Sequence, residues 1–108
     1  MLFRSAELAG IQRIVSGDQY MTVYKAYKPE AENAATIAVA LVQGKPVPSG
    51  LVNTKTNNGK IDVPSVILTP VAVTQANIKS TVVKDGLYTV KQICTSAYAS
   101  ACKKIGLQ

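Results

Sequence analysis

The segment 31–43 constrains the fold of this chain more than any other. It is rich in alanine, and drawn as a helix it is apolar around most of its circumference. Pro29 and Glu30, just before it, are typical of a first helical turn, and Gly44 ends it. A helix that is apolar on most sides is normally packed on two sides rather than lying on a surface. We therefore expect a helix here that other elements cover on both sides.

The rest of the chain alternates between helical and extended patterns. Apolar residues recur at helical spacing in three further segments, and β-branched or aromatic residues gather in three short extended ones. The expected helices are 6–16, 75–84 and a last amphipathic helix from Val90 to Ile105. The expected extended segments are Tyr20–Lys25, the buried strand Val66–Leu68, and Val71–Val73.

Asn57-Asn58-Gly59 is a turn signal, which predicts a hairpin joining 51–56 to 60–66. Pro64 argues that the second arm is an edge or begins after the proline. The order of elements indicates the α/β class.

Composition excludes several kinds of site. The chain has 108 residues, 47% of them hydrophobic and 17% charged, which fits a folded chain of single-domain size. It contains no histidine, so Ser-His-Asp triads, Cys-His pairs and most catalytic zinc sites are excluded. No dinucleotide, P-loop or nucleophile-elbow motif occurs. We expect no enzymatic activity, no cofactor and no metal. No run is long enough for a membrane span, and the first residues lack the apolar stretch of a signal peptide.

The positive charge lies in the second part of the chain. Residues 1–32 are neutral overall, whereas 33–108 hold eight lysines against Asp62 and Asp85, which accounts for the net charge of +6. A basic half can indicate nucleic-acid binding. These lysines are scattered, residues 33–108 contain no arginine, and no aromatic-rich basic stripe occurs, which favours a solvated surface and no nucleic-acid partner.

Cys94 and Cys102 leave two readings open. On one unbroken helix, residues eight apart lie about 12 Å from each other. A disulfide needs Cα atoms roughly 4.4–6.8 Å apart. The pair is therefore either two buried thiols on one helix face, which the spacing slightly favours, or a disulfide across a break in the helix.

Lys25 is the most informative single residue. It ends an expected strand and precedes a helix, and ligands of α/β sheets bind beyond the carboxyl ends of strands. A lysine at that place can donate hydrogen bonds to hydroxyl groups. By position alone, an ordinary solvated lysine is the more frequent outcome.

Several motifs together resemble a known family. Their order and spacing are similar to those of the D-xylose-binding proteins of ABC importers, within the type I periplasmic sugar-binding family. The motifs are Ala6-Glu7-Leu8-Ala9-Gly10-Ile11-Gln12-Arg13-Ile14, Met21-Thr22-Val23-Tyr24-Lys25, Asn57-Asn58-Gly59-Lys60, Asp62-Val63-Pro64-Ser65-Val66-Ile67-Leu68-Thr69-Pro70 and Val83-Lys84-Asp85-Gly86. The resemblance covers nearly the whole chain from residue 6. It corresponds to the C-terminal third or so of a family member.

The resemblance implies a partial type I periplasmic-binding-protein fold with Rossmann-like lobes, in which an incomplete sheet is flanked by helices. Residues 6–25 and 69–108 then belong to the second lobe and 26–68 to the first. Lys25 matches the family lysine that hydrogen-bonds the sugar. Its neighbour Ala26 and the stretch Leu68-Thr69-Pro70 correspond to crossings between the lobes, where hinge motion is expected.

The resemblance also implies partners and a compartment. A family member binds a xylose-like monosaccharide, docks on an ABC permease, and meets the membrane only through that permease. The parent protein is expected to be periplasmic or extracellular. Export makes a disulfide between Cys94 and Cys102 more plausible than spacing alone does.

The match fails at Phe3-Arg4-Ser5. The family reads Gly-Gln-Asp at this place, and its aspartate binds sugar hydroxyls. We therefore expect a truncated sugar-binding protein whose sugar binding is weak or absent, and whose uncovered surfaces favour a homodimer. The alternative is a module that docks a permease or sensor partner without binding sugar.

Overall fold

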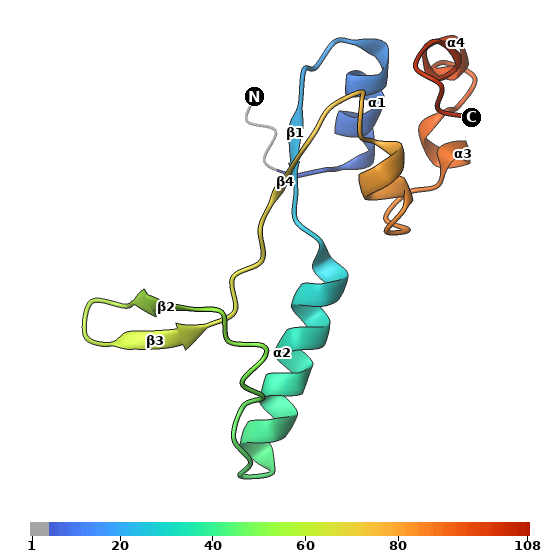
Figure 1. Cartoon of the computed structure of the whole chain (residues 1–108). Coiled ribbons are helices and arrows are strands. Elements are labelled where there is room, and N and C mark those ends of the chain that lie inside the picture. The colour runs from blue at the N-terminus through green and yellow to red at the C-terminus, as the bar shows by residue number, and fades with distance from the viewer. Residues whose placement is uncertain (1–4) are drawn as a thin grey trace. The chain divides into compact units, whose positions relative to one another are not determined.

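The computed structural model describes residues 5–108, which form two compact units (Figure 1). Unit 1 combines the residues up to Lys25 with Pro70–Gln108, and unit 2 is Ala26–Thr69. The chain leaves unit 1 after Lys25 and returns to it at Pro70. No helix in the described part of the chain has the length and apolar character needed to cross a membrane.

Unit 1 is built on two short strands and the helices around them. Helix α1 (Leu8–Ser16) is followed by β1 (Thr22–Tyr24), which pairs antiparallel with β4 (Val71–Val73). After β4 come the π-helix η1 (Lys79–Val83), α3 (Val90–Ile93) and α4 (Ala99–Lys104). Helix α1 packs against both α3 and α4. The expected helix and strand in the first 25 residues and the extended segment 71–73 are confirmed.

The core of unit 1 is apolar and continuous with the strand pair. The fully buried side chains come from every element of the unit, namely Ile11, Ile14, Val15, Thr22, Val73, Ile78, Val82, Ile93 and Cys102. Gln75 ties this core together, because its side-chain amide donates to the carbonyls of Ile14 and Val15 at the end of α1. The Gly17 N–H at the C-cap also donates to the Ile14 carbonyl, so the Gln75 side chain adds to the backbone cap at this end of α1.

The helix expected over 75–84 is shorter than predicted. Asn77 accepts a hydrogen bond from the Thr74 backbone and donates one to the Ala72 carbonyl, which holds residues 74–77 in a turn. Asparagine side chains compete with helical hydrogen bonds in this way. The helical part is confined to η1, where the Lys84 backbone N–H donates to the Lys79 carbonyl five residues back. Ile78 and Val82 are nevertheless both buried, as the spacing predicts.

The single helix expected from Val90 to Ile105 is wrong. Helix α3 ends at Ile93 and α4 begins at Ala99. A turn separates them, in which the Tyr98 backbone N–H donates to the Thr95 carbonyl. Cys94 and Cys102 form a disulfide with Cα atoms 5.9 Å apart. That separation is about half of what one unbroken helix allows. The apolar periodicity survives because Ile93 and Cys102 both reach the core from two separate helices.

Unit 2 holds one long helix and one hairpin. Helix α2 (Tyr27–Val42) begins two residues before Pro29, and β2 (Thr54–Asn57) pairs antiparallel with β3 (Asp62–Ser65). The predicted hairpin is therefore confirmed. Its turn is held by Asn58, whose side-chain oxygen accepts hydrogen bonds from the backbones of Lys60 and Ile61. Gly59 takes a φ of 91°, a conformation that glycine adopts without steric cost.

The buried strand expected over 66–68 does not form. Both Ile67 and Leu68 are exposed, and neither belongs to a strand. Both backbone groups of Ile67 are instead hydrogen-bonded to the Asn53 side chain. Its amide oxygen accepts from the Ile67 N–H at 3.0 Å, and its amide nitrogen donates to the Ile67 carbonyl at 2.9 Å. A single side-chain amide thus provides the backbone hydrogen bonds that a neighbouring strand would otherwise supply.

Helix α2 is not packed on two sides as its composition predicts. Ala40 is the one buried residue in unit 2, all of whose residues the structure describes. Large apolar side chains of α2 are exposed, among them Leu41 at 64% and Val42 at 88%. The expected covering on both sides is therefore absent from the residues described.

The disulfide is expected to stabilise unit 1. Closing a loop of eight residues lowers the entropy of the unfolded chain, which corresponds to about 2–3 kcal/mol. Replacing both cysteines with alanine should lower the free energy of unfolding in urea by this amount. The reduced wild-type chain is the control and should match the double variant. Equal stability of oxidised and reduced chains would contradict the expectation.

Candidate functional site

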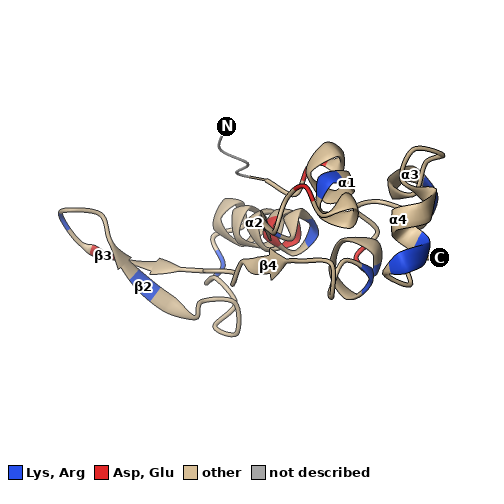
Figure 2. Cartoon of the chain, turned by 90° about the horizontal axis from the view of Figure 1, so that it is seen from above, with Lys and Arg blue, Asp and Glu red and all other residues tan. Residues whose placement is uncertain are grey.

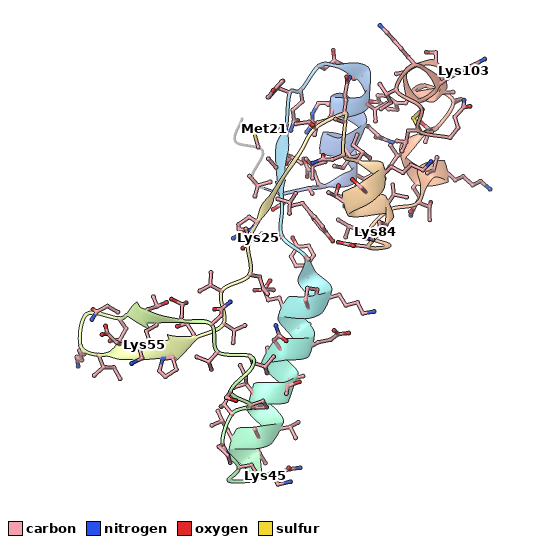
Figure 3. All side chains as sticks on the ribbon, in the orientation of Figure 1. Met21, Lys25, Lys45, Lys55, Lys84 and Lys103 are labelled. Atoms are coloured by element: carbon pink, nitrogen blue, oxygen red, sulfur yellow. A yellow bond between two sulfur atoms is a disulfide. The ribbon has the colours of Figure 1, made fainter. Side chains whose placement is uncertain are left out.

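Lys25 lies at the point where the chain leaves unit 1. It follows the last residue of β1 directly, and its side chain is exposed (Figure 3). Within residues 5–108, no hydrogen bond or ion pair engages its ammonium group. Three N–H donors are therefore available to an external acceptor such as a hydroxyl oxygen. The structure places Lys25 at a strand end, as the sequence predicts, while its role stays a prediction.

The strand pairing brings the two crossing points of unit 1 together. Tyr24 lies opposite Val71 in the ladder, so Lys25 and Pro70 follow at the same end of the two strands. Of the other predicted hinge residues, Ala26, Leu68 and Thr69 belong to unit 2. Thr69 and Pro70 are exposed and lie outside any strand or helix, so no ladder hydrogen bond restrains them. Their hinge role remains a prediction.

Tyr24 anchors this end of β1 to the turn that follows η1. Its ring is buried, and its hydroxyl donates to the Asp85 carboxylate at 3.0 Å. The pKa of the Tyr24 hydroxyl is raised above its ordinary value of 10.0, first by burial and then by the hydrogen bond and the negative charge of Asp85. Sequence reasoning missed this pair. Both residues lie within motifs quoted above, but nothing in their spacing of 61 residues predicts contact.

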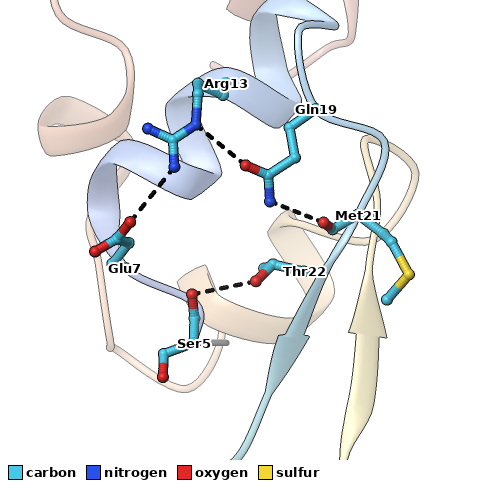
Figure 4. A network of polar contacts seen from close by, with 6 residues as sticks. All are labelled: Ser5, Glu7, Arg13, Gln19, Met21 and Thr22. Carbon is cyan, nitrogen blue, oxygen red and sulfur yellow. Dashed lines mark hydrogen bonds and ion pairs between the residues drawn. The ribbon is translucent and has the colours of Figure 1, made fainter. Parts of the chain in front are cut away.

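A polar network orders the other end of β1 (Figure 4). The Thr22 hydroxyl donates to the Ser5 carbonyl at 3.1 Å, and Arg13 reaches Gln19 at 3.1 Å and Glu7 at 3.4 Å. Gln19 in turn donates to the Met21 carbonyl at 2.8 Å. These contacts fix the path of the chain from α1 into β1.

The sequence departure at residues 3–5 is only partly described. Phe3 and Arg4 lie outside the described residues. Ser5 is exposed, and its backbone carbonyl accepts from Thr22. A serine hydroxyl carries no negative charge and offers fewer acceptor sites than the aspartate that the resemblance implies at this place.

No candidate metal centre emerges from the described part of the chain. No three His, Cys, Asp or Glu side chains gather there, and both cysteines are bonded to each other. Charges are dispersed along the described elements in Figure 2, which shows no single basic stripe. Among the described residues, the geometry therefore offers the exposed ammonium group of Lys25 at the end of β1.

Comparison with known proteins confirms the resemblance read from the motifs. The chain is 49% identical over 85 residues to the D-xylose-binding periplasmic protein of Escherichia coli and 44% over 90 residues to that of Haemophilus influenzae. It is 34% identical over 91 residues to the multiple sugar-binding periplasmic receptor ChvE of Rhizobium radiobacter. These matches take in 79–83% of this chain but only 25–26% of each relative. No protein-family model matches.

Solved structures agree with these relatives. A carbohydrate transporter solute-binding protein from Chloroflexus aurantiacus, in complex with D-glucose, matches 81% of this chain with a TM-score of 0.73 and 34% identity. An ABC transporter solute-binding protein from Clostridium phytofermentans, with bound β-D-glucose, matches 82% with a TM-score of 0.70 and 27% identity. The chain covers 25% and 27% of those proteins. The expected fold class, a partial α/β sugar-binding-protein fold, is confirmed.

The Tyr24–Asp85 contact predicts a pH dependence of stability. Because folding raises the Tyr24 pKa, the folded state holds the phenolic proton more tightly than the unfolded state does. The resulting stabilisation is complete below about pH 10 and is lost as the pH rises through the folded-state pKa. Tyr24→Phe should cost about 1 kcal/mol at pH 7 and flatten the decline above about pH 10.

Urea unfolding from pH 7 to pH 11 measures this effect. Asp85→Asn is the matched control, since its amide oxygen still accepts the hydrogen bond while the negative charge is gone. The free energy of unfolding of Asp85→Asn should decline with pH less steeply than that of the wild type and more steeply than that of Tyr24→Phe. Identical pH profiles for all three chains would contradict the assignment.

Proposed function

We propose that this chain, which is homologous over four fifths of its length to D-xylose-binding periplasmic proteins, is part of the monosaccharide-binding component of an ABC importer. In the whole protein, two lobes close around a xylose-type sugar and deliver it to a membrane permease. The protein would act in the periplasm and would carry sugar without enzymatic chemistry or a cofactor.

One observation carries the proposal most directly. Identity of 44–49% to two xylose-binding proteins coincides with a lysine whose ammonium group has no partner among the described residues. In this proposal Lys25 donates hydrogen bonds to the sugar hydroxyls. The adjoining Ala26 and the stretch Leu68-Thr69-Pro70 absorb the backbone rotation as the lobes close. Unit 1 then belongs to the second lobe and unit 2 to the first.

The chain by itself is expected to bind sugar weakly. Lys25 supplies donors only, whereas a sugar hydroxyl also needs acceptors for its own protons. A serine stands where the resemblance implies a carboxylate. The chain also spans only about a quarter of the relatives' length, so most of a cleft's wall would come from residues with no counterpart here.

Calorimetry with D-xylose tests this expectation. The isolated chain should show no binding tighter than a Kd of about 1 mM. Any residual binding seen by saturation-transfer NMR should be lost in Lys25→Met and kept in Lys28→Met, which removes a nearby exposed lysine. Sub-millimolar binding would contradict the proposal of weak binding. Equal loss in both variants would contradict the role of Lys25.

Self-association is expected from the uncovered surfaces. Both two-stranded sheets have unpaired outer edges, and several large apolar side chains of unit 2 are exposed. Such edges and patches favour contacts between copies. Light scattering over a concentration series should show a mass that rises with concentration. A constant monomer mass at high concentration would overturn this expectation.

A further inference from the structure

The chain contains five asparagines, and one of them precedes a glycine. An asparagine side chain can react with the backbone nitrogen of the next residue, because the two groups close a five-membered ring. A side chain on that next residue shields the nitrogen, whereas glycine leaves it open. Asn58 is followed by Gly59. The other four asparagines are followed by larger residues, namely Ala34, Thr54, Asn58 and Ile78.

The side-chain amide nitrogen of Asn58 is free to leave. Within residues 5–108 it makes no hydrogen bond. In Asn53, Asn57 and Asn77 the same nitrogen donates to a carbonyl or carboxylate oxygen at 2.8–2.9 Å. Asn33 lies inside α2, where the N–H of the following residue is bonded within the helix. The other four asparagines are thus each held by a contact or by a helix.

The side-chain oxygen of Asn58 faces two backbone donors. It accepts from the N–H groups of Lys60 and Ile61, each at 3.0 Å. Attack on the side-chain carbon places negative charge on this oxygen, and fixed N–H donors stabilise such a charge as they do in an oxyanion hole. The hydrogen bonds that hold the turn therefore also favour the first step of a reaction at Asn58.

The turn is open to water. Every residue from Asn57 to Asp62 is exposed, and residues 58–61 belong to no helix or strand. The Gly59 N–H donates to the Asn57 side-chain oxygen at 2.8 Å, and this exposed contact has to open before the nitrogen can attack. Gly59 has no Cβ and a φ of 91°, so its backbone can rotate with little steric cost.

We propose that Asn58 deamidates spontaneously, with water as the only co-reactant. The Gly59 nitrogen loses its proton to water or hydroxide and forms a bond to Cγ of Asn58. The bond from Cγ to Nδ2 breaks, and this nitrogen takes up a proton and leaves as ammonia. Water then opens the succinimide ring at either of its two carbonyls, which gives an aspartate or an isoaspartate at position 58. Nothing is oxidised or reduced.

The two products should affect the hairpin differently. An aspartate at position 58 keeps an acceptor for the Lys60 and Ile61 N–H groups, and its charge strengthens both hydrogen bonds. An isoaspartate lengthens the main chain by one carbon, inside the loop that the Asn58 N–H closes on the Ile61 carbonyl at 3.1 Å. Either product lowers the net charge of +6 by one. The inference does not depend on the proposed function.

Timed incubation of the full chain tests the proposal. The chain is kept in warm, neutral buffer made with heavy-oxygen water, and its peptides are mapped by mass spectrometry. The product at position 58 should carry one heavy oxygen. Its formation should be about tenfold or more faster than deamidation at Asn53, the exposed control in the same unit, because two oxyanion donors can change a rate by at least this factor. Equal rates at the two asparagines would overturn the proposal.

Variants locate the reaction. A protein isoaspartate methyltransferase should label the wild-type peptide that holds position 58 and should leave Asn58→Gln unlabelled. Gly59→Ala shields the attacking nitrogen and should slow the reaction to the rate seen at Asn53. Gly50→Ala is the matched control, since its added Cβ has no atom within 4 Å, and it should react as the wild type does. An unlabelled wild type, or a Gly59→Ala chain as fast as the wild type, contradicts the assignment.

A comparison with the unfolded chain tests the contribution of the turn. In guanidinium chloride the hydrogen bonds to the Asn58 side chain are lost, while the Asn58–Gly59 sequence remains. The folded chain should react at Asn58 at least as fast as the unfolded chain. At Asn53 the fold should slow the reaction, because its amide nitrogen is held by the Ile67 carbonyl. A slower reaction of the folded chain at Asn58 would show that the turn protects this residue, and the proposal would then be wrong.

Discussion

The antiparallel pairing of β1 with β4 is the contact on which the rest of unit 1 depends. It joins Thr22–Tyr24 to Val71–Val73 across the whole of unit 2, so unit 1 closes only after the chain has left it and returned. The entropic cost of closing a loop grows only slowly with its length, so burial of the core can offset the cost of closing a loop as long as unit 2. The same pairing puts Lys25 and Pro70 at one end of the ladder and leaves the lysine side chain exposed there.

Unit 2 has no comparable long-range contact. Its hairpin joins β2 to β3 directly, and the Asn53 contact with Ile67 spans 14 residues. Isolated helices and two-stranded hairpins are marginally stable in water. Unit 2 has a single buried residue, Ala40, so fewer of its apolar side chains are buried than in unit 1. The two units thus differ in how many of their apolar side chains their own described residues bury.

The errors in the predicted helices and strands have two causes, side chains that bind backbone groups and a disulfide. At residues 74–77 and at Ile67, asparagine side chains bind backbone groups that a helix or strand would otherwise use. Between Val90 and Ile105, a disulfide draws together two residues that a helix would hold apart. Apolar periodicity identified the buried side chains Ile78, Val82 and Ile93 correctly, but it did not show where the backbone breaks.

Local signals were enough for α1, β1, α2 and the hairpin, because capping, turn chemistry and periodicity act within a few residues. Local signals also identified Lys25 as a candidate, since the end of a strand followed by the start of a helix can be predicted from neighbouring residues. The Tyr24–Asp85 contact, the packing of α1 on α3 and α4, and the exposure of Leu41 and Val42 on α2 were decided by tertiary structure. Each depends on whether residues far apart in the chain meet, and no short-range pattern encodes that.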